Sequence, residues 1–368
     1  MKTILCVVGT RPEAIKMAPV ILALKKEPWA DVRVLATAQH REMLDQVLGL
    51  FDIKPNIDLN LMQKEQTLPE LTARLMTTLD LALSDETPDA VLAQGDTTTV
   101  MVAALAAFYR CTPFGHVEAG LRTGDMAYPF PEEMNRVVTG RLARWHFAPT
   151  ESARANLLAE GVGADRILVT GNTVIDALLD VSKRCDEFAP RISPGNRLVL
   201  LTVHRRENFG EPFLEICRAI KYLADTRRDI EFLYPIHPNP NVRDVAIKTL
   251  GHHPRIRLCD PLEYVSFVAA MKAAYFVLSD SGGVQEEAPA LGKPVLVLRQ
   301  ETERPEAVKE GVVKLVGPNC DAIVHESVRL LDDEKEYYSM ARGISPYGDG
   351  NASTRIAAAL HCYLLDNA

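Results

Sequence analysis

The chain contains 368 residues and has a mass of 40.7 kDa, a length that predicts two or three domains of roughly 150 residues each. Hydrophobic residues make up 47% and charged residues 24%, which is typical of globular proteins and excludes collagen-like, mucin-like and largely disordered chains. The 41 basic and 49 acidic residues give a net charge of −8, and the pI is near 5.7. This balance excludes a bulk attraction to nucleic acid or to an anionic membrane, so an anionic ligand must be held by a local basic cluster.

Neither a membrane span nor a disulfide framework is expected. The longest uncharged apolar run, residues 100–109, is much shorter than the about 20 residues that a transmembrane helix needs. The apolar start, residues 1–8, is followed by residues 9–13 (Gly-Thr-Arg-Pro-Glu) without a small-residue cleavage site, so it predicts a buried strand and not a signal peptide. The seven cysteines are odd in number, scattered and form no CxxC pair. They predict reduced thiols in a cytoplasmic protein.

Short runs rich in Val, Ile and Leu alternate with longer amphipathic stretches in the first half of the chain. The runs predict strands at 3–8, 32–37, 90–93, 114–117, 146–148 and 167–170. Helical patterns lie between them at 41–50, 68–83 and 98–109. Continuous apolar strands that alternate with helices are typical of parallel sheets covered on both faces.

A second series of the same kind follows a segment without periodicity. Residues 186–196 contain two prolines and a glycine and predict a linker. After it, strands are expected at 197–202, 231–234, 257–258, 275–278, 294–298 and 313–315, and helices at 212–224, 242–250, 264–273, 284–291 and 321–331. The sequence therefore predicts an α/β protein with two domains of similar size, 1–185 and 197–352, whose parallel sheets flank a cleft.

Polar residues and glycines gather where the predicted strands end. They occur at 9–11, 94–96, 118–120, 204–207, 237–239 and 280–283. In open parallel sheets, ligands bind beyond the carboxyl ends of the strands. These loops together predict a binding site in the cleft.

The nucleotide motifs point to one phosphate-binding segment. The sequence has no GxxxxGK[ST], no GxGxxG after a strand, no Asp-x-Asp and no HExxH, so it gives no support for a P-loop, a dinucleotide or a metal site. Residues 279–287 follow an apolar strand, and their adjacent glycines and the start of a helix suit a phosphate. Glu287, one turn into that helix, is suited to accept hydrogen bonds from a ribose diol. The alternative is that Ser281 only caps the helix.

Basic groups suited to a diphosphate lie in or near the strand-end loops: Arg11, Lys16, His204, Arg205, Arg206 and Arg304. Phe267 could stack on a base, although an aromatic residue there is more often part of a core.

Asp96 could be a catalytic carboxylate or the cap of a helix that begins near Thr98. Glu132 or Glu133 could be a first-turn glutamate stabilised by the helix dipole.

Together these segments resemble the non-hydrolysing UDP-N-acetylglucosamine 2-epimerases. The resemblance covers essentially the whole chain and rests on residues 9–19, 94–99, 116–123, 131–136, 202–208, 280–289 and 302–307. It implies a GT-B-like fold of two Rossmann-like domains in which the last helix, within 353–368, returns to the N-terminal domain. It also implies reversible conversion of UDP-N-acetylglucosamine (UDP-GlcNAc) to UDP-N-acetylmannosamine (UDP-ManNAc) for bacterial surface polysaccharides, with no metal, no nicotinamide cofactor and a homodimer.

The resemblance further implies roles for individual residues. Those implied in catalysis are Asp96, Glu118, Glu132 and His204. Those implied in substrate binding are Arg11, Lys16, Asp96, Glu118, His204, Phe267, Ser281, Gly282, Gly283, Glu287 and Arg304, with Leu262 contacting the uracil through its backbone. Relatives bind a second, activating UDP-GlcNAc, and the residues that match its site are Gln39, His40, Gln66, Arg205 and His237. Glu65 stands where some relatives carry Arg, a departure that bears on whether substrate activates this chain.

The residues suit an elimination mechanism. The C2 proton of UDP-GlcNAc is weakly acidic because no carbonyl is adjacent, and the sequence offers no nicotinamide site for oxidising a neighbouring carbon. Loss of UDP from C1 would make that proton removable and give a 2-acetamidoglucal, and re-addition with protonation on the opposite face would invert C2. The reaction needs carboxylates as acid and base and cationic or hydrogen-bonding groups on the departing diphosphate.

Four alternatives stay open at this point. A 2-epimerase of a related UDP-2-acetamido sugar would form a different product. A GT-B glycosyltransferase would require an acceptor and be inert on UDP-GlcNAc alone. A hydrolysing epimerase would release free ManNAc. A UDP-sugar sensor would have no need for the proton-transfer groups.

Overall fold

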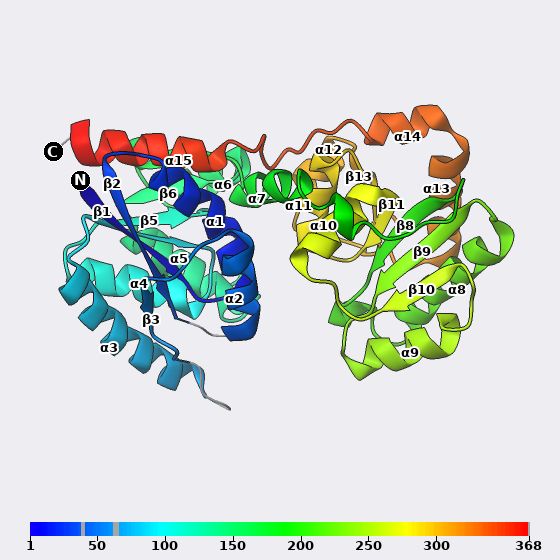
Figure 1. Cartoon of the computed structure of the whole chain (residues 1–368), viewed down its shortest axis with the longest axis horizontal. Coiled ribbons are helices and arrows are strands. Elements are labelled where there is room, and N and C mark those ends of the chain that lie inside the picture. The colour runs from blue at the N-terminus through cyan, green and yellow to red at the C-terminus, as the bar shows by residue number, and fades with distance from the viewer. Residues whose placement is uncertain (38–40, 62–65, 367–368) are drawn as a thin grey trace. The chain divides into compact units, whose positions relative to one another are not determined.

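The computed structural model describes residues 1–37, 41–61 and 66–366. Two compact units are present: unit 1 comprises Met1–Ala177 and Tyr347–Ala368, and unit 2 comprises Leu178–Pro346. Each unit is built on one parallel sheet with helices against it (Figure 1). The predicted α/β class with two Rossmann-like sheets is confirmed.

In the described part of unit 1, seven parallel strands occur in the order β3-β2-β1-β4-β5-β6-β7. Both faces of β4 are buried, as expected for a parallel strand that helices cover on both sides. The strands are β1 Lys2–Val8, β2 Ala30–Ala36, β3 Ile57–Asp58, β4 Ala90–Gln94, β5 Phe114–Val117, β6 Trp145–Ala148 and β7 Ile167–Val169. The helices are α1 Arg11–Lys25, α2 Arg41–Leu50, α3 Leu68–Glu86, α4 Thr98–Tyr109, α5 Glu132–Leu142, α6 Glu151–Ala159, α7 Thr173–Ser182 and α15 Ala352–His361.

In unit 2, over the residues described, six parallel strands occur in the order β10-β9-β8-β11-β12-β13. They are β8 Arg197–Thr202, β9 Ile230–Pro235, β10 Ile256–Cys259, β11 Ala274–Ser279, β12 Val295–Val297 and β13 Val313–Leu315. The helices are α8 Glu211–Thr226, α9 Pro240–Leu250, α10 Tyr264–Ala273, α11 Gly282–Ala290, α12 Pro305–Lys309, α13 Cys320–Asp332 and α14 Glu334–Met340. None of the helices in the described ranges is long and apolar enough to cross a membrane.

The chain passes from unit 1 to unit 2 within α7, between Ala177 and Leu178, which is earlier than the linker expected at 186–196. The ammonium of Lys272 on α10 explains the difference. It donates hydrogen bonds to the carbonyl oxygen of Ser182 (2.8 Å) and to Asp186 (2.7 Å). The segment after Leu178 is therefore fixed to unit 2, and the start of the expected linker, Asp186–Phe188, is a short 3₁₀ helix.

Each sheet has one place where neighbouring strands are followed by loops that leave in opposite directions. In unit 1 this place lies between β1 and β4, and in unit 2 it lies between β8 and β11. Such a switch point leaves a crevice at the carboxyl ends of the strands, where ligands of open α/β sheets bind. The loops after these four strands carry much of the polar sequence singled out above.

The last helix, α15, packs on α1 within unit 1 (Figure 1, red). The buried carboxylate of Asp176 on α7 anchors its first turn, because it accepts hydrogen bonds from the backbone N–H groups of Ala352 (3.2 Å) and Ser353 (2.8 Å) and from the Ser353 hydroxyl (2.5 Å). Near the other end of the helix, Tyr363 stacks on Trp145 with ring centroids 5.1 Å apart. The expected return of the last helix to the N-terminal half therefore has a specific anchor.

Replacing Asp176 by Ala should lower the free energy of unfolding of unit 1 by about 1–3 kcal/mol, because the donors at the start of α15 lose a buried acceptor. Both tryptophans of the chain, Trp29 and Trp145, lie in unit 1. Tryptophan fluorescence during urea unfolding therefore reports on this unit. The matched control is Asp80→Ala, which removes a half-exposed ion pair with Arg110 and should cost much less than the loss of Asp176. Equal losses would show that Asp176 is not a buried anchor.

Candidate functional site

The loop after β1 is joined to the loop after β4 by the buried carboxylate of Glu13. One oxygen accepts the backbone N–H groups of Gly9 (2.6 Å) and Thr10 (2.9 Å), and the other accepts the Thr97 hydroxyl (2.5 Å). Burial raises the pKa of Glu13 to about 7, although these hydrogen bonds lower it. Gly9 is required by close packing, since a Cβ there would lie 2.9 Å from the Thr99 hydroxyl.

Glu118, directly after β5, is the centre of a polar cluster. Its carboxylate pairs with the Lys16 ammonium at 2.6 Å and accepts hydrogen bonds from the Asn172 side chain at 2.7 Å and from Gln94. The side chain is only 6% exposed. Its backbone has φ = 65°, the left-handed region that non-glycine residues rarely adopt. A strained backbone that holds a buried carboxylate at a strand end is typical of a functional site.

Asp96, in the loop after β4, pairs with Arg136 of α5, with its Oδ2 2.7 Å from the guanidinium. The Asn135 side chain also donates to the backbone oxygen of Asp96. The cap of α4 is Thr97, whose side chain accepts from the Val100 N–H. Of the two roles considered for Asp96, helix capping is therefore wrong.

Glu132 and Glu133 both lie in the first turn of α5 but differ in environment. Glu133 is buried and accepts hydrogen bonds from the N–H groups of Thr123 (3.0 Å) and Gly124 (3.1 Å). Glu132 is half-buried. Glu133 is thus a structural anchor of the loop before α5.

In unit 2, the segment after β11 opens α11 without a side-chain cap. Ser281 is the N-cap residue, yet its hydroxyl accepts no hydrogen bond from the first turn. The prediction that Ser281 only caps the helix is therefore wrong. Gly282 and Gly283 begin the helix, and a Cβ at Gly282 would lie 3.7 Å from the guanidinium of Arg205. The N-terminus of α11 thus combines backbone donors, a favourable helix dipole and an adjacent cation, as an anion site requires.

Two carboxylates of α11 have different partners. Glu287 is 7% exposed and accepts a hydrogen bond from the Tyr264 hydroxyl at 3.1 Å. Burial and the adjacent Glu287 raise the pKa of Tyr264 well above its usual value, so the phenol stays a donor. Glu286 instead pairs with Arg304, one of the predicted diphosphate ligands. Arg304 is therefore held in place by Glu286 and is 19% exposed.

His204 lies in the loop after β8, across the switch point from α11. Its Nδ1 is 3.0 Å from Oδ1 of Asp280. The ring of His237 lies beside it, with centroids 6.0 Å apart. Nε of the nearby Arg205 is buried and has no partner among the described residues. Three predicted residues of unit 2, His204, Arg205 and His237, thus lie near Asp280 and the glycine loop, Ser281–Gly283.

The remaining predicted residues are more dispersed. Leu262 and Phe267 are half-buried, before and within α10, and Arg11 is exposed at the first position of α1. Gln66 accepts a hydrogen bond from Arg74 at 2.5 Å. Gln39 and His40 lie outside the described residues.

Sequence reasoning missed several residues that organise these sites: Glu13, Gln94, Arg136, Asn172, Tyr264 and Asp280. A signal existed for Glu13, because Thr10 and Glu13 have the spacing of a capping box. For the others the partner is distant along the chain, as between Asn172 and Glu118, 54 residues apart. Within the described residues, no group of three His, Cys, Asp or Glu side chains could hold a metal ion.

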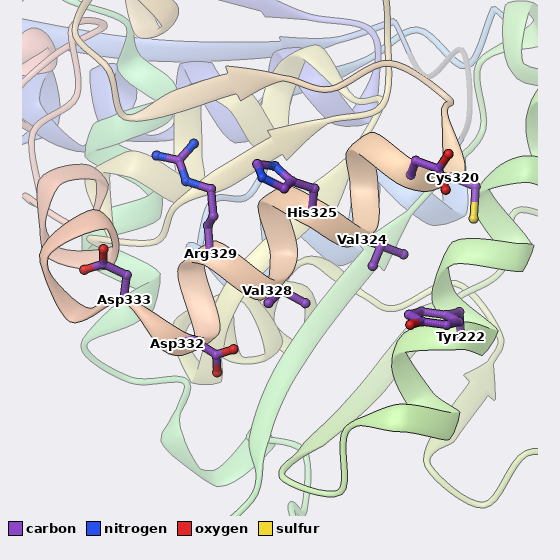
Figure 2. Close-up of a pocket in the computed structure, with 9 residues that line it drawn as sticks. Tyr222, Cys320, Val324, His325, Val328, Arg329, Asp332 and Asp333 are labelled. Atoms are coloured by element: carbon purple, nitrogen blue, oxygen red, sulfur yellow. The ribbon is translucent and has the colours of Figure 1, made fainter.

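A separate groove of about 740 Å³ lies in unit 2 on α8 and α13. Figure 2 shows its lining, which includes Tyr222 of α8 and Val324, Val328 and Arg329 of α13. None of the predicted site residues lines it. The strand-end loops, and not this groove, carry the concentration of reactive groups.

Comparison with known proteins gives a consistent result. Residues 22–361 match the family model described as UDP-N-acetylglucosamine 2-epimerase. The chain is 55% identical over 367 residues to the UDP-N-acetylglucosamine 2-epimerase of Escherichia coli K12, covering 97% of this chain and 98% of the relative. It is 51% identical over 359 residues to the enzyme of that name from Bacillus subtilis, covering 97% and 94%. A crystal structure of UDP-GlcNAc 2-epimerase from Neisseria meningitidis bound to UDP-GlcNAc matches with TM-score 0.88 and 49% identity, covering 97% of this chain and 99% of that one.

The raised pKa of Glu13 predicts a pH-dependent stability of unit 1. Between pH 4.5, the ordinary pKa of the group, and about 7 in the folded chain, the folded state retains a proton that the unfolded state releases. The unfolding free energy should therefore fall as pH rises through this window, by up to about 3 kcal/mol.

Glu13→Gln should remove this pH-dependent part of the unfolding free energy, because glutamine does not titrate. The fold should be kept, because the amide oxygen can still accept the two backbone N–H groups. Urea unfolding of both proteins at pH 5, 6, 7 and 8, followed by tryptophan fluorescence, gives the difference between them. A difference that does not change with pH would contradict the prediction.

Proposed function

The chain belongs to the UDP-N-acetylglucosamine 2-epimerase family, and we propose that it interconverts UDP-GlcNAc and UDP-ManNAc by eliminating and re-adding UDP. The observation that carries this proposal is the pair of strand-end sites. Unit 1 concentrates carboxylates around Glu118 and Asp96, and unit 2 combines an uncapped glycine-rich helix start with the buried acceptor Glu287. Proton transfer and nucleotide binding are the two abilities that the reaction demands.

The carboxylates of unit 1 take and return the C2 proton. Inversion requires removal of the proton from one face of the sugar and its return to the other, so two acid–base groups are needed. Asp96, Glu118 and Glu132 supply them. The fixed, nearly buried position of Glu118 supports a role for this residue, because Lys16 and Asn172 hold its carboxylate in one place. Lys16 beside it compensates for its charge, and Arg11 contributes a second cation for the substrate.

The groups of unit 2 bind the UDP part. Glu287 accepts the ribose hydroxyls, and Tyr264 holds its carboxylate in place through the bond at 3.1 Å. Ser281, Gly282 and Gly283 offer backbone N–H groups to the diphosphate. His204 and Arg304 add charge-assisted hydrogen bonds that strengthen as the leaving group gains charge. Leu262 and Phe267 flank the uracil.

Relatives bind a second, activating UDP-GlcNAc, and the same ligand is considered for this chain, in which Glu65 stands where some relatives carry Arg. The residues proposed for it in the described chain are Gln66, Arg205 and His237. The support is local to unit 2, where Arg205 lies on the glycine loop and His237 lies beside His204. A ligand on these two side chains would be in contact with the diphosphate-binding groups, which would couple the two binding events.

The chain acts in the cytoplasm as a homodimer and supplies sugars for bacterial surface polysaccharides. All seven cysteines are free thiols, which supports a reducing compartment. Large apolar side chains exposed on α3 and α4, including Leu81 (59%) and Phe108 (58%), support burial of this face of unit 1 in a dimer.

The first test of the proposed function is product formation in D2O. Purified enzyme incubated with UDP-GlcNAc, with EDTA present and no cofactor added, should form UDP-ManNAc that carries deuterium at C2, because the proton is exchanged while the glucal exists. NMR of the product gives the isotope at that carbon. Full protium at C2, or a requirement for NAD, would exclude the elimination mechanism. Inertness without an acceptor would instead favour a glycosyltransferase.

Glu287→Ala should weaken UDP binding by about 1.5–3 kcal/mol, because a charged acceptor of hydrogen bonds is lost. Calorimetry with UDP measures this loss. The matched control is Glu263→Ala, which removes an exposed glutamate just before α10 whose side chain caps nothing and should leave the affinity unchanged. Unaltered UDP affinity in Glu287→Ala would show that α11 is not the nucleotide site.

A further inference from the structure

Asp280, the residue after β11, is a carboxylate for which the proposed reaction gives no role. Its side chain is fully buried. Its Oδ2 accepts hydrogen bonds from the Arg205 N–H (2.8 Å) and the Asn208 side chain (3.0 Å), and the His204 N–H is shared between Oδ2 (3.0 Å) and Oδ1 (3.1 Å). Oδ1 also faces the His204 ring, 3.0 Å from Nδ1. Oδ2 therefore provides most of the anchoring of the loop after β8, and Oδ1 contacts the imidazole as well as the His204 backbone.

The carboxyl group of Asp280 is ionised in this environment. Burial by itself would raise the pKa of Asp280, but the interactions with His204 and Arg205 outweigh it and leave the pKa below its usual value. A carboxylate can only accept hydrogen bonds, so the ring nitrogen that faces it must carry a proton. That fixes the proton of a neutral His204 on Nδ1 and leaves a lone pair on Nε2.

We propose that Asp280 is a positioning residue that holds His204 so that Nε2 can exchange a proton with the diphosphate of the substrate. The inference rests on the proposed function. As the C1–O bond breaks, its electron pair stays on the diphosphate oxygen, and Nε2 of the imidazolium gives that oxygen a proton. The electrons of the C2–H bond form the C1=C2 bond, and a carboxylate of unit 1 takes the C2 proton. In re-addition a second carboxylate of unit 1 protonates C2 on the opposite face, the diphosphate oxygen bonds to C1, and the proton of that oxygen returns to Nε2. The ion pair with Asp280 stabilises the imidazolium that is present before elimination and after re-addition.

Asp280→Asn separates the two functions of this side chain. The amide oxygen can occupy the place of Oδ2 and keep its three hydrogen bonds, and only the longer contact of the His204 N–H with Oδ1 (3.1 Å) is lost. The amide NH₂ group then faces Nδ1, which must accept, so the proton moves to Nε2. The ring remains a hydrogen-bond donor to phosphate but can no longer take up a proton there. UDP affinity should therefore stay within about threefold, whereas kcat should fall by roughly 10²- to 10⁴-fold, the range of a lost acid–base catalyst.

The matched control is Asn208→Ser, which removes a donor to Oδ2 and leaves the contact with Nδ1 intact. It should lower the unfolding midpoint and reduce kcat by less than about tenfold. A loss of kcat as large as that of Asp280→Asn would mean that Asp280 only anchors the loop. Combining Asp280→Asn with His204→Gln should give no further loss beyond His204→Gln alone, because residues that act as one unit are not additive. Additive losses would overturn the proposal.

The tautomer itself is measured without turnover. Long-range ¹H–¹⁵N NMR of the histidine rings, with His204 assigned by its absence in His204→Gln, should show the neutral ring protonated on Nδ1 in the unaltered protein and on Nε2 in Asp280→Asn. A neutral ring protonated on Nε2 in the unaltered protein overturns the inference even if the enzyme is an active epimerase. Conversely, absence of UDP-GlcNAc turnover with the Nδ1 tautomer present would reject the proposed function and leave the contact between the two residues established.

Discussion

A carboxylate that is removed from water must be met by several donors, and this requirement organises both sites. An unpaired buried charge costs several kcal/mol. Glu118 and Asp280 offset that cost by collecting donors from segments that are distant along the chain, for example from Lys16 and Asn172 around Glu118. Glu13 instead keeps its proton up to about pH 7. The same contacts hold the strand-end loops in one arrangement. The hydrogen bonds that stabilise each buried acid therefore also hold the neighbouring loops in place.

The two units apply the same geometric rule to different chemistry. In both sheets the strand order creates one switch point, and the loops that flank it carry the polar groups. Unit 1 fills its loops with carboxylates and cations suited to proton transfer. Unit 2 has Gly282 and Gly283 at the start of a helix that no side chain caps. A common fold thus provides the position, and the loop residues determine the chemistry.

Most strands were predictable because their apolar runs are continuous, and only β3, Ile57–Asp58, is too short to leave a pattern. Loop positions followed from the strands. The local sequence does not reveal which partner each loop side chain contacts. Thr97 and not Asp96 caps α4, since Arg136 takes the Asp96 carboxylate. Asp280 accepts a hydrogen bond from His204, 76 residues away, a contact that depends on the parallel pairing of β8 with β11.

The return of α15 to unit 1 has a consequence for synthesis on the ribosome. Unit 2 is inserted in the chain between α7 and α15, so its whole sheet emerges before the helix that completes unit 1. Until then the surface of α1 that packs on α15, and the ring of Trp145 that stacks on Tyr363, have no covering partner. Unit 2 can fold as an uninterrupted segment during translation, whereas unit 1 must wait with apolar surface exposed, the state in which a nascent chain depends most on chaperones.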